Sequence, residues 1–196
     1  MLRISVLFVY NHTKVKWIIA FTTLIVVTSK IWFFTYNPYF ELVDLPLAYF
    51  GWIFCLLNIV AAVCSHEAHR FTKYLGEFGG VTMMIILTAL PIWLMGVYVV
   101  QISVLLVLMQ NVVRGYMGPF MGGLLHQHLD SENRATVVSL KSTVNNIGQF
   151  IVLITFSLFL NAWPLPLCLQ ILGISTLFIG VFLVISFRLI FRPAHS

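Results

Sequence analysis

The sequence is dominated by apolar runs long enough to cross a lipid bilayer, with short polar or turn-forming links between them. A spanning helix needs about 20 mainly apolar residues. Lipid offers no partners for backbone N–H and C=O groups, and the runs lack the alternation of a membrane β-barrel, so these segments must be helices. The sequence therefore predicts an all-α polytopic membrane protein with six transmembrane helices, at Val15–Tyr36, Leu45–Ser65, Gly79–Met95, Val97–Leu125, Ala135–Leu160 and Leu165–Ile190.

The small charged fraction agrees with a lipid environment. Only 9% of the 196 residues are charged and 60% are apolar, whereas about a quarter of a soluble domain is charged. We predict that residues 15–190 form the bundle, residues 1–14 a cytoplasmic N-terminal segment and residues 191–196 a cytoplasmic tail. The lipid bilayer is then the main partner. Nucleic acid is not an expected partner, because the basic residues are scattered and form no patch.

The distribution of Lys and Arg predicts the orientation of the bundle. Eight basic residues flank the spans on one side, at Arg3, Lys14, Lys16, Arg70, Lys73, Arg134, Arg188 and Arg192, whereas the alternate links contain none. Because basic residues concentrate in cytoplasmic links, both termini are predicted to be cytoplasmic.

Three cations lie inside the predicted spans, at Lys30, Arg114 and Lys141. An ionisable group at the bilayer centre costs about 2.5 to 3.5 kcal/mol on insertion scales, so each must face a partner, a cavity or the interface. Lys141 lies close enough to the cytoplasmic end of its span to extend its amine to the interface. Arg114 lies near the midplane, so it is the strongest functional candidate.

Two polar stripes accompany these cations at helical spacing. One, in the fourth span, consists of Gln110, Arg114 and Gly118, overlapped by a small-residue strip of Asn111, Gly115, Gly118 and Gly122. The other, in the fifth span, consists of Lys141, Asn145, Asn146 and Gln149. Both patterns fit helix packing, with interhelical hydrogen bonds and close approach. They equally fit the lining of a solute pathway.

The segment Tyr36–Phe40 carries Asn37 and Pro38 at the end of the first span. Proline removes a helical hydrogen bond and disfavours helical geometry in the preceding residue, so we expect the helix to bend or stop there. A broken helix beside a central site and an aromatic belt at the outer interface are both consistent with this sequence.

No enzyme or metal site is predicted. The pairs His66/His69 and His126/His128 lack a nearby cysteine or a carboxylate cluster, the zinc-protease helix motif is absent, and no nucleophile elbow or phosphate loop is present. We expect neither a cofactor nor catalytic residues.

The run Arg114–Gln149 resembles the tenth and eleventh helices of major facilitator superfamily transporters and the short cytoplasmic link between them. The most specific part is Asp130-Ser131-Glu132-Asn133-Arg134-Ala135-Thr136-Val137-Val138-Ser139, similar to the Ser-Glu-x-Arg-Ala-Thr-x-x-Ser stretch of many bacterial members. Asp130 or Ser131 can also cap the following helix, and Glu132 favours its positive end. The link that contains His66, Arg70 and Lys73 departs from the family's Gly-x-x-x-Asp-Arg pattern.

The resemblance implies a C-terminal half of that fold, in which the first and fourth spans line a central cavity. Substrate would then meet Lys30, Tyr36, Asn37, Gln110, Asn111 and Arg114, with Asn145 and Gln149 as further pathway residues. Asp130, Glu132 and Arg134 would belong to a cytoplasmic gate. The implied function is secondary transport of a small solute by alternating access, in a plasma membrane such as the bacterial inner membrane. The partner would be an N-terminal six-helix half or a second copy of the chain. The alternative is a non-transporting membrane subunit or an inactive transporter fragment.

Overall fold

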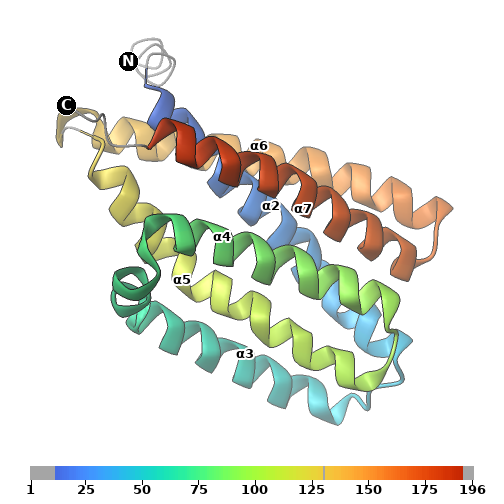
Figure 1. Ribbon diagram of the computed structural model, residues 1–196. Helices are drawn as coiled ribbons and strands as arrows, with labels where there is room; N and C mark the ends of the chain where they lie inside the picture. The colour runs from blue at the N-terminus through green and yellow to red at the C-terminus, as the bar shows by residue number, and fades with distance from the viewer. Residues whose placement is uncertain (1–11, 130, 192–196) are drawn as a thin grey trace.

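The computed structural model describes residues 12–129 and 131–191, except for the side chains of residues 131–133. All regular secondary structure within these ranges is helical (Figure 1). The elements are α2 (Thr13–Leu42), α3 (Ala48–His66), α4 (Ala68–Val97), the 3-10 helix η1 (Gln101–Leu105), α5 (Leu106–His126), α6 (Ser131–Ala162) and α7 (Leu165–Ile190). The prediction of an all-α fold is confirmed.

Several helix boundaries differ from those predicted. α2 continues as a helix through Pro38 to Leu42, so the expected stop at Asn37 does not occur. The missing N–H of Pro38 removes only the hydrogen bond to the Phe34 carbonyl. Tyr39 and Phe40, which follow it, are fully buried in the core, and this packing holds the last turns of α2 in place.

The polar link between the second and third predicted spans is itself helical. α4 starts at Ala68 and has a kink at Gly76, whose φ of 66° and ψ of 176° are not helical. Only glycine adopts this conformation readily. The predicted fourth span is shorter than expected, because its first residues form a turn and η1, and α5 begins only at Leu106.

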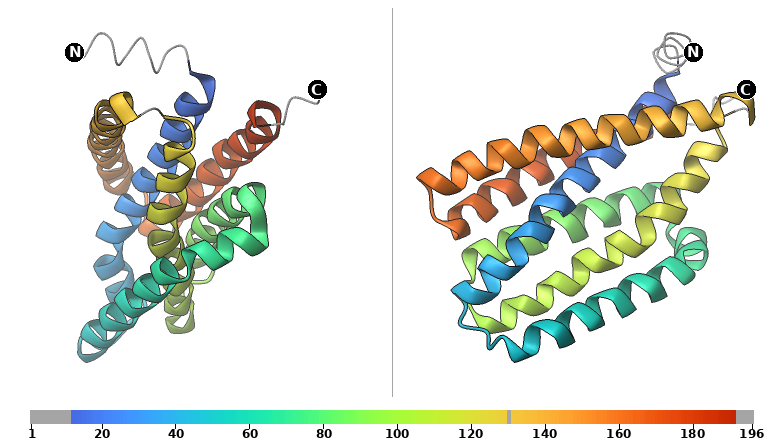
Figure 2. Two further views of the ribbon diagram at one scale, coloured as in Figure 1. Left: turned by 90° about the vertical axis from the view of Figure 1, so that its left-hand side faces the viewer. Right: turned by 180° about the vertical axis from the view of Figure 1, so that it is seen from behind.

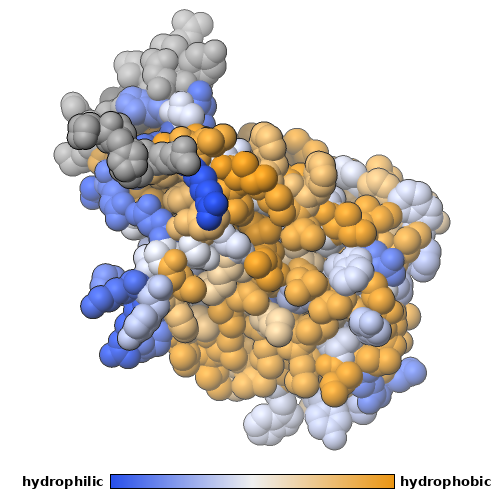
Figure 3. Space-filling view, viewed as in Figure 1, coloured by the Kyte–Doolittle hydropathy of each residue, from blue (hydrophilic) through white to orange (hydrophobic). Residues whose placement is uncertain are grey.

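Five helices, α2, α3, α4, α6 and α7, are long and apolar enough to cross a membrane. α5 has 21 residues, and its polar and glycine residues lower its hydropathy. It lies between α3 and α4, so other helices cover part of its surface. These features support a multi-pass membrane protein, and the face formed by α4 and α7 presents a broad apolar band with hydrophilic residues towards its ends (Figure 3).

The bundle has α6 at one edge and α3 at the other, with α2 and α5 between them (Figures 1 and 2). α4 and α7 pack against each other and cover α2 and α5 from one side. The α4–α7 contact is close because Gly173 faces the backbone of Trp93, where a Cβ atom would lie 2.8 Å from the Trp93 nitrogen. Small residues at helix interfaces permit such approach in membranes.

The start of α2 and the end of α7 lie at the same end of the bundle. The indole Nε1 of Trp17 donates a hydrogen bond of 2.9 Å to the Leu183 carbonyl, and the Trp17 ring lies 5.0 Å from that of Phe187. The two ends of the bundle therefore lie on the same side, as the six predicted crossings would require.

Candidate substrate-binding face

The side of α2 and α5 that α4 and α7 do not cover is the candidate site (Figure 2). We call it the open face. Its exposed polar and aromatic side chains come from α2, α3 and α5: Lys30, Phe33, Asn37, Asn58 and Arg114.

Arg114 forms the central polar contact of the open face. Its Nη2 donates a hydrogen bond of 2.7 Å to Oδ1 of Asn58 on α3. The Asn58 amide nitrogen in turn donates to the Phe54 carbonyl, also at 2.7 Å, which fixes the amide with its oxygen towards Arg114. A neutral amide therefore receives one donor of the guanidinium and supplies no counter-charge.

A second polar pair lies beside Arg114, at the boundary between the open face and the core. The Asn111 amide donates to the Val107 carbonyl at 3.0 Å and, more weakly, to the Tyr36 hydroxyl at 3.4 Å. Both side chains are buried, and the Tyr36 ring lies 6.0 Å from that of Phe54 on α3. α2, α3 and α5 thus bring Tyr36, Asn58, Asn111 and Arg114 together.

Close approach of α3 and α5 makes this cluster possible. A Cβ atom on Gly115 would overlap the carbonyl group of Ala61, so glycine is required for the observed spacing. Gly118 and Gly122 have nothing within 4 Å of an added Cβ. Of the glycines in the predicted strip, these two do not mediate helix contact.

Gln110 lies apart from this cluster, although the spacing of four residues places it on one face with Arg114. It is 4% exposed, and its amide donates a 3.2 Å hydrogen bond to the Thr88 carbonyl of α4. Its Oε1 has no partner among the described residues. Gln110 therefore contributes to the α4–α5 interface, whereas Arg114 contacts α3.

The two remaining predicted residues of α2 lie on its exposed side. The Lys30 ammonium lies 5.8 Å from the ring centre of Phe33 and 5.3 Å from that of Phe34, so aromatic rings partly compensate its charge. Asn37 is exposed about two helical turns beyond Lys30. Phe33 connects this stripe to the cluster, because its ring lies 5.9 Å from that of Tyr36.

The polar stripe of the fifth predicted span lies on α6. Asn145 accepts a hydrogen bond of 2.7 Å from the Thr23 hydroxyl of α2, so it contributes to helix packing. Gln149 donates within α6, to the Asn145 carbonyl at 3.2 Å. Neither side chain has a hydrogen bond to the Arg114 cluster in the described structure.

The predicted gate residues are only partly described. Arg134 is exposed near the start of α6. Asp130 and the side chain of Glu132 lie outside the described residues, so their capping and gating roles stay predictions.

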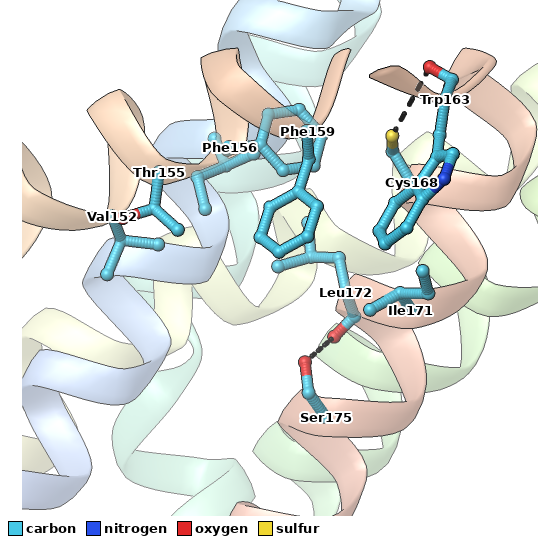
Figure 4. Close-up of a pocket in the computed structure, with 10 residues that line it drawn as sticks. Val152, Thr155, Phe156, Phe159, Trp163, Cys168, Ile171, Leu172 and Ser175 are labelled. Atoms are coloured by element: carbon cyan, nitrogen blue, oxygen red, sulfur yellow. Dashed lines mark hydrogen bonds between the residues drawn. The ribbon is translucent and has the colours of Figure 1, made fainter. Parts of the chain in front are cut away.

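Two cavities of the described structure lie away from the cluster. A groove of about 140 Å³ between α6 and α7 has an almost entirely apolar lining that includes Phe156, Phe159, Trp163 and Leu172 (Figure 4). A more polar cavity of about 270 Å³ lies between α4 and the end of α5, beside His69, Thr72 and Gln127. The first has no charged group that could recognise a polar solute.

Asn58 was missed in the sequence because it is an isolated polar residue in an apolar span. Its position near the middle of a predicted helix was the one available signal, and its partner became visible only when α3 and α5 were placed side by side. No family model, no curated protein and no solved structure matches this chain.

Proposed function

We propose that this chain is the C-terminal six-helix half of a secondary transporter of the major facilitator type, which moves a small solute across a plasma membrane by alternating access. The observation that carries the proposal is an internal repeat in the helix packing.

The repeat relates α2, α3 and α4 to α5, α6 and α7. In this repeat α2 corresponds to α5, α3 to α6 and α4 to α7. The contact of α3 with α5 therefore corresponds to that of α6 with α2, and the contact of α4 with α5 corresponds to that of α7 with α2; all four contacts are present. The contacts of α4 with α7 and of α2 with α5 map onto themselves. Since each unit has three helices, the second enters the membrane from the opposite side. Inverted repeats of this kind are typical of secondary transporters, with the binding site between repeats.

The two sides of the bundle differ in a way that fits a half-transporter. The α4–α7 side is broadly apolar (Figure 3), as a lipid-facing surface should be. The open face has a cation, Arg114, about 12 Å from the first residue of α5, and charged groups at such depth face protein or water-filled cavities. A second six-helix half, either a separate N-terminal half or another copy, would cover this face and enclose the cavity.

In this arrangement the cluster of Tyr36, Asn58, Asn111 and Arg114 contacts the solute, and Arg134 acts at the cytoplasmic gate. The function belongs to the open face and is not enzymatic. In the proposed orientation both termini are cytoplasmic. A coupling carboxylate would have to come from the other half, because the six acidic residues lie in the predicted links.

Reconstitution tests transport directly. The chain is placed in liposomes alone and together with a candidate N-terminal half, and uptake of labelled carboxylates, amino acids and sugars is compared with uptake by empty liposomes. We expect uptake to fall in Arg114→Ala and to persist in Arg188→Gln. Arg188 is a suitable control because its guanidinium lies 4.1 Å from the centre of the Phe78 ring, away from the cluster. No uptake in either preparation would favour the non-transporting alternative, and uptake unchanged in Arg114→Ala would exclude the role of the cluster.

Cysteine accessibility tests the orientation. In a background without Cys55, Cys64 and Cys168, single cysteines at Asp44 and Asn161 should react with an impermeant reagent from outside. A cysteine at Arg134 should react only after permeabilisation. Labelling of the Arg134→Cys variant from outside would refute the orientation.

A further inference from the structure

The acidic side chains of the described structure lie away from Arg114. Glu41 and Asp44 lie at one end of the bundle, and Glu67 and Glu77 lie near the kinked start of α4. Glu67 forms an ion pair with Arg70 at 2.8 Å. Within the described ranges, no carboxylate forms an ion pair with Arg114.

The neighbours of Arg114 leave much of its binding capacity unused. The guanidinium has donors in a planar fork, and its one hydrogen bond within the described structure goes to Asn58. The side chain is exposed on the open face. An oxyanion could accept hydrogen bonds from the remaining N–H donors of Arg114, because the guanidinium geometry matches two oxygens of a carboxylate or phosphate.

The other polar groups of the cluster fit the same kind of ligand. The Tyr36 hydroxyl can donate its hydrogen to a ligand, because its oxygen accepts from the Asn111 amide, whose other hydrogen goes to the Val107 carbonyl. The aromatic side chains of Phe33 and Phe54, which contact the Tyr36 ring, provide an apolar wall beside this donor. The site thus combines one permanent cation, a neutral donor and an apolar surface.

We infer that Arg114, with the Tyr36 hydroxyl, binds the oxyanion group, a carboxylate or a phosphate, of the transported solute. This inference rests on the proposed transport function and specifies its substrate class. The bound oxyanion supplies the counter-charge that the described residues do not, and its apolar part lies against the aromatic wall. The Asn58 oxygen holds one edge of the guanidinium so that the other edge faces the solute.

Equilibrium binding tests the inference without requiring transport. The full chain in phosphatidylcholine nanodiscs is titrated with acetate and with inorganic phosphate at constant ionic strength, with glucose as a neutral control, and the thermal unfolding midpoint is followed. A ligand that binds the folded state raises this midpoint saturably. We expect saturation with acetate or phosphate, and none with glucose.

The variants assign any binding to Arg114. Loss of a charged hydrogen-bonding partner should weaken the apparent Kd at least about tenfold in Arg114→Gln, with intermediate affinity in Arg114→Lys and unchanged affinity in Arg188→Gln. Circular dichroism checks that each variant is folded. Absence of saturable oxyanion binding, or equal affinity in Arg114→Gln and the parent chain, would overturn the inference.

Lipid headgroups are a second source of phosphate, so the titration is repeated with phosphatidylglycerol added. Unchanged affinity for the soluble anion supports the inference, whereas competition by phosphatidylglycerol would assign the site to a headgroup and overturn it. Transport of a neutral solute without Arg114-dependent anion binding would refute the substrate class alone. Anion binding in a chain that never transports would refute the proposed function alone.

Discussion

Replacement of Gly115 by alanine should loosen the α3–α5 interface that forms the Arg114 cluster. An added Cβ would lie 2.9 Å from the carbonyl carbon of Ala61 and 3.0 Å from its Cα, whereas ordinary contact begins at 3.4 Å. The distance from the added Cβ to the carbonyl carbon is thus 0.5 Å shorter than ordinary contact (3.4 − 2.9 Å), and the overlap with the carbonyl oxygen is larger. Because this partner is backbone, α3 must move as a unit, and overpacking of this kind costs about 1 to 3 kcal/mol.

Gly118→Ala is the matched control, three residues further along α5. Nothing lies within 4 Å of its added Cβ, and alanine is favoured over glycine in a helix by about 1 kcal/mol. The free energy of unfolding is measured by SDS titration in mixed micelles, with tryptophan fluorescence as the signal. Gly115→Ala should be less stable than the parent, and Gly118→Ala equal or more stable. Equal stability of the two variants would refute the close approach of α3 and α5.

Three further tests of the packing use the same measurement. Gly76→Ala should lose about 1 to 3 kcal/mol because its φ of 66° is unfavourable for alanine, whereas Gly51→Ala, which has open space around it, should not; a stable Gly76→Ala would contradict the kink. A double-mutant cycle of Thr28→Val and Thr176→Val should give a coupling near 0.6 kcal/mol, since their hydroxyls form a buried 3.1 Å hydrogen bond; zero coupling would argue against that bond. Tyr39→Phe should lose about 0.5 to 1.5 kcal/mol, because its hydroxyl lies 2.6 Å from the Ser103 hydroxyl and 3.0 Å from the Met95 carbonyl, and an unchanged stability would show that these hydrogen bonds contribute nothing.

The location of the helices followed largely from local properties of the sequence. Backbone groups must be satisfied within each segment in lipid, so length and hydropathy alone predicted the apolar helices, and the link before α7 was found where Trp163 and Pro164 interrupt them. The boundaries at Pro38 and Gly76 were less predictable. Burial of Tyr39 and Phe40 offsets the missing hydrogen bond at Pro38, and a positive φ at one glycine leaves no distinctive pattern in the surrounding residues.

The candidate site depended on tertiary structure. The sequence by itself determined that the chain forms long apolar helices, which are compatible with a membrane, and that Arg114 is a cation within one of the predicted spans. It could not determine which neighbour each polar side chain meets, because helical spacing gives the face of one helix and says nothing about the helix packed against it. Packing of α5 between α3 and α4 directs Gln110 to the Thr88 carbonyl and Arg114 to Asn58, and only that packing decided which polar residues form the cluster.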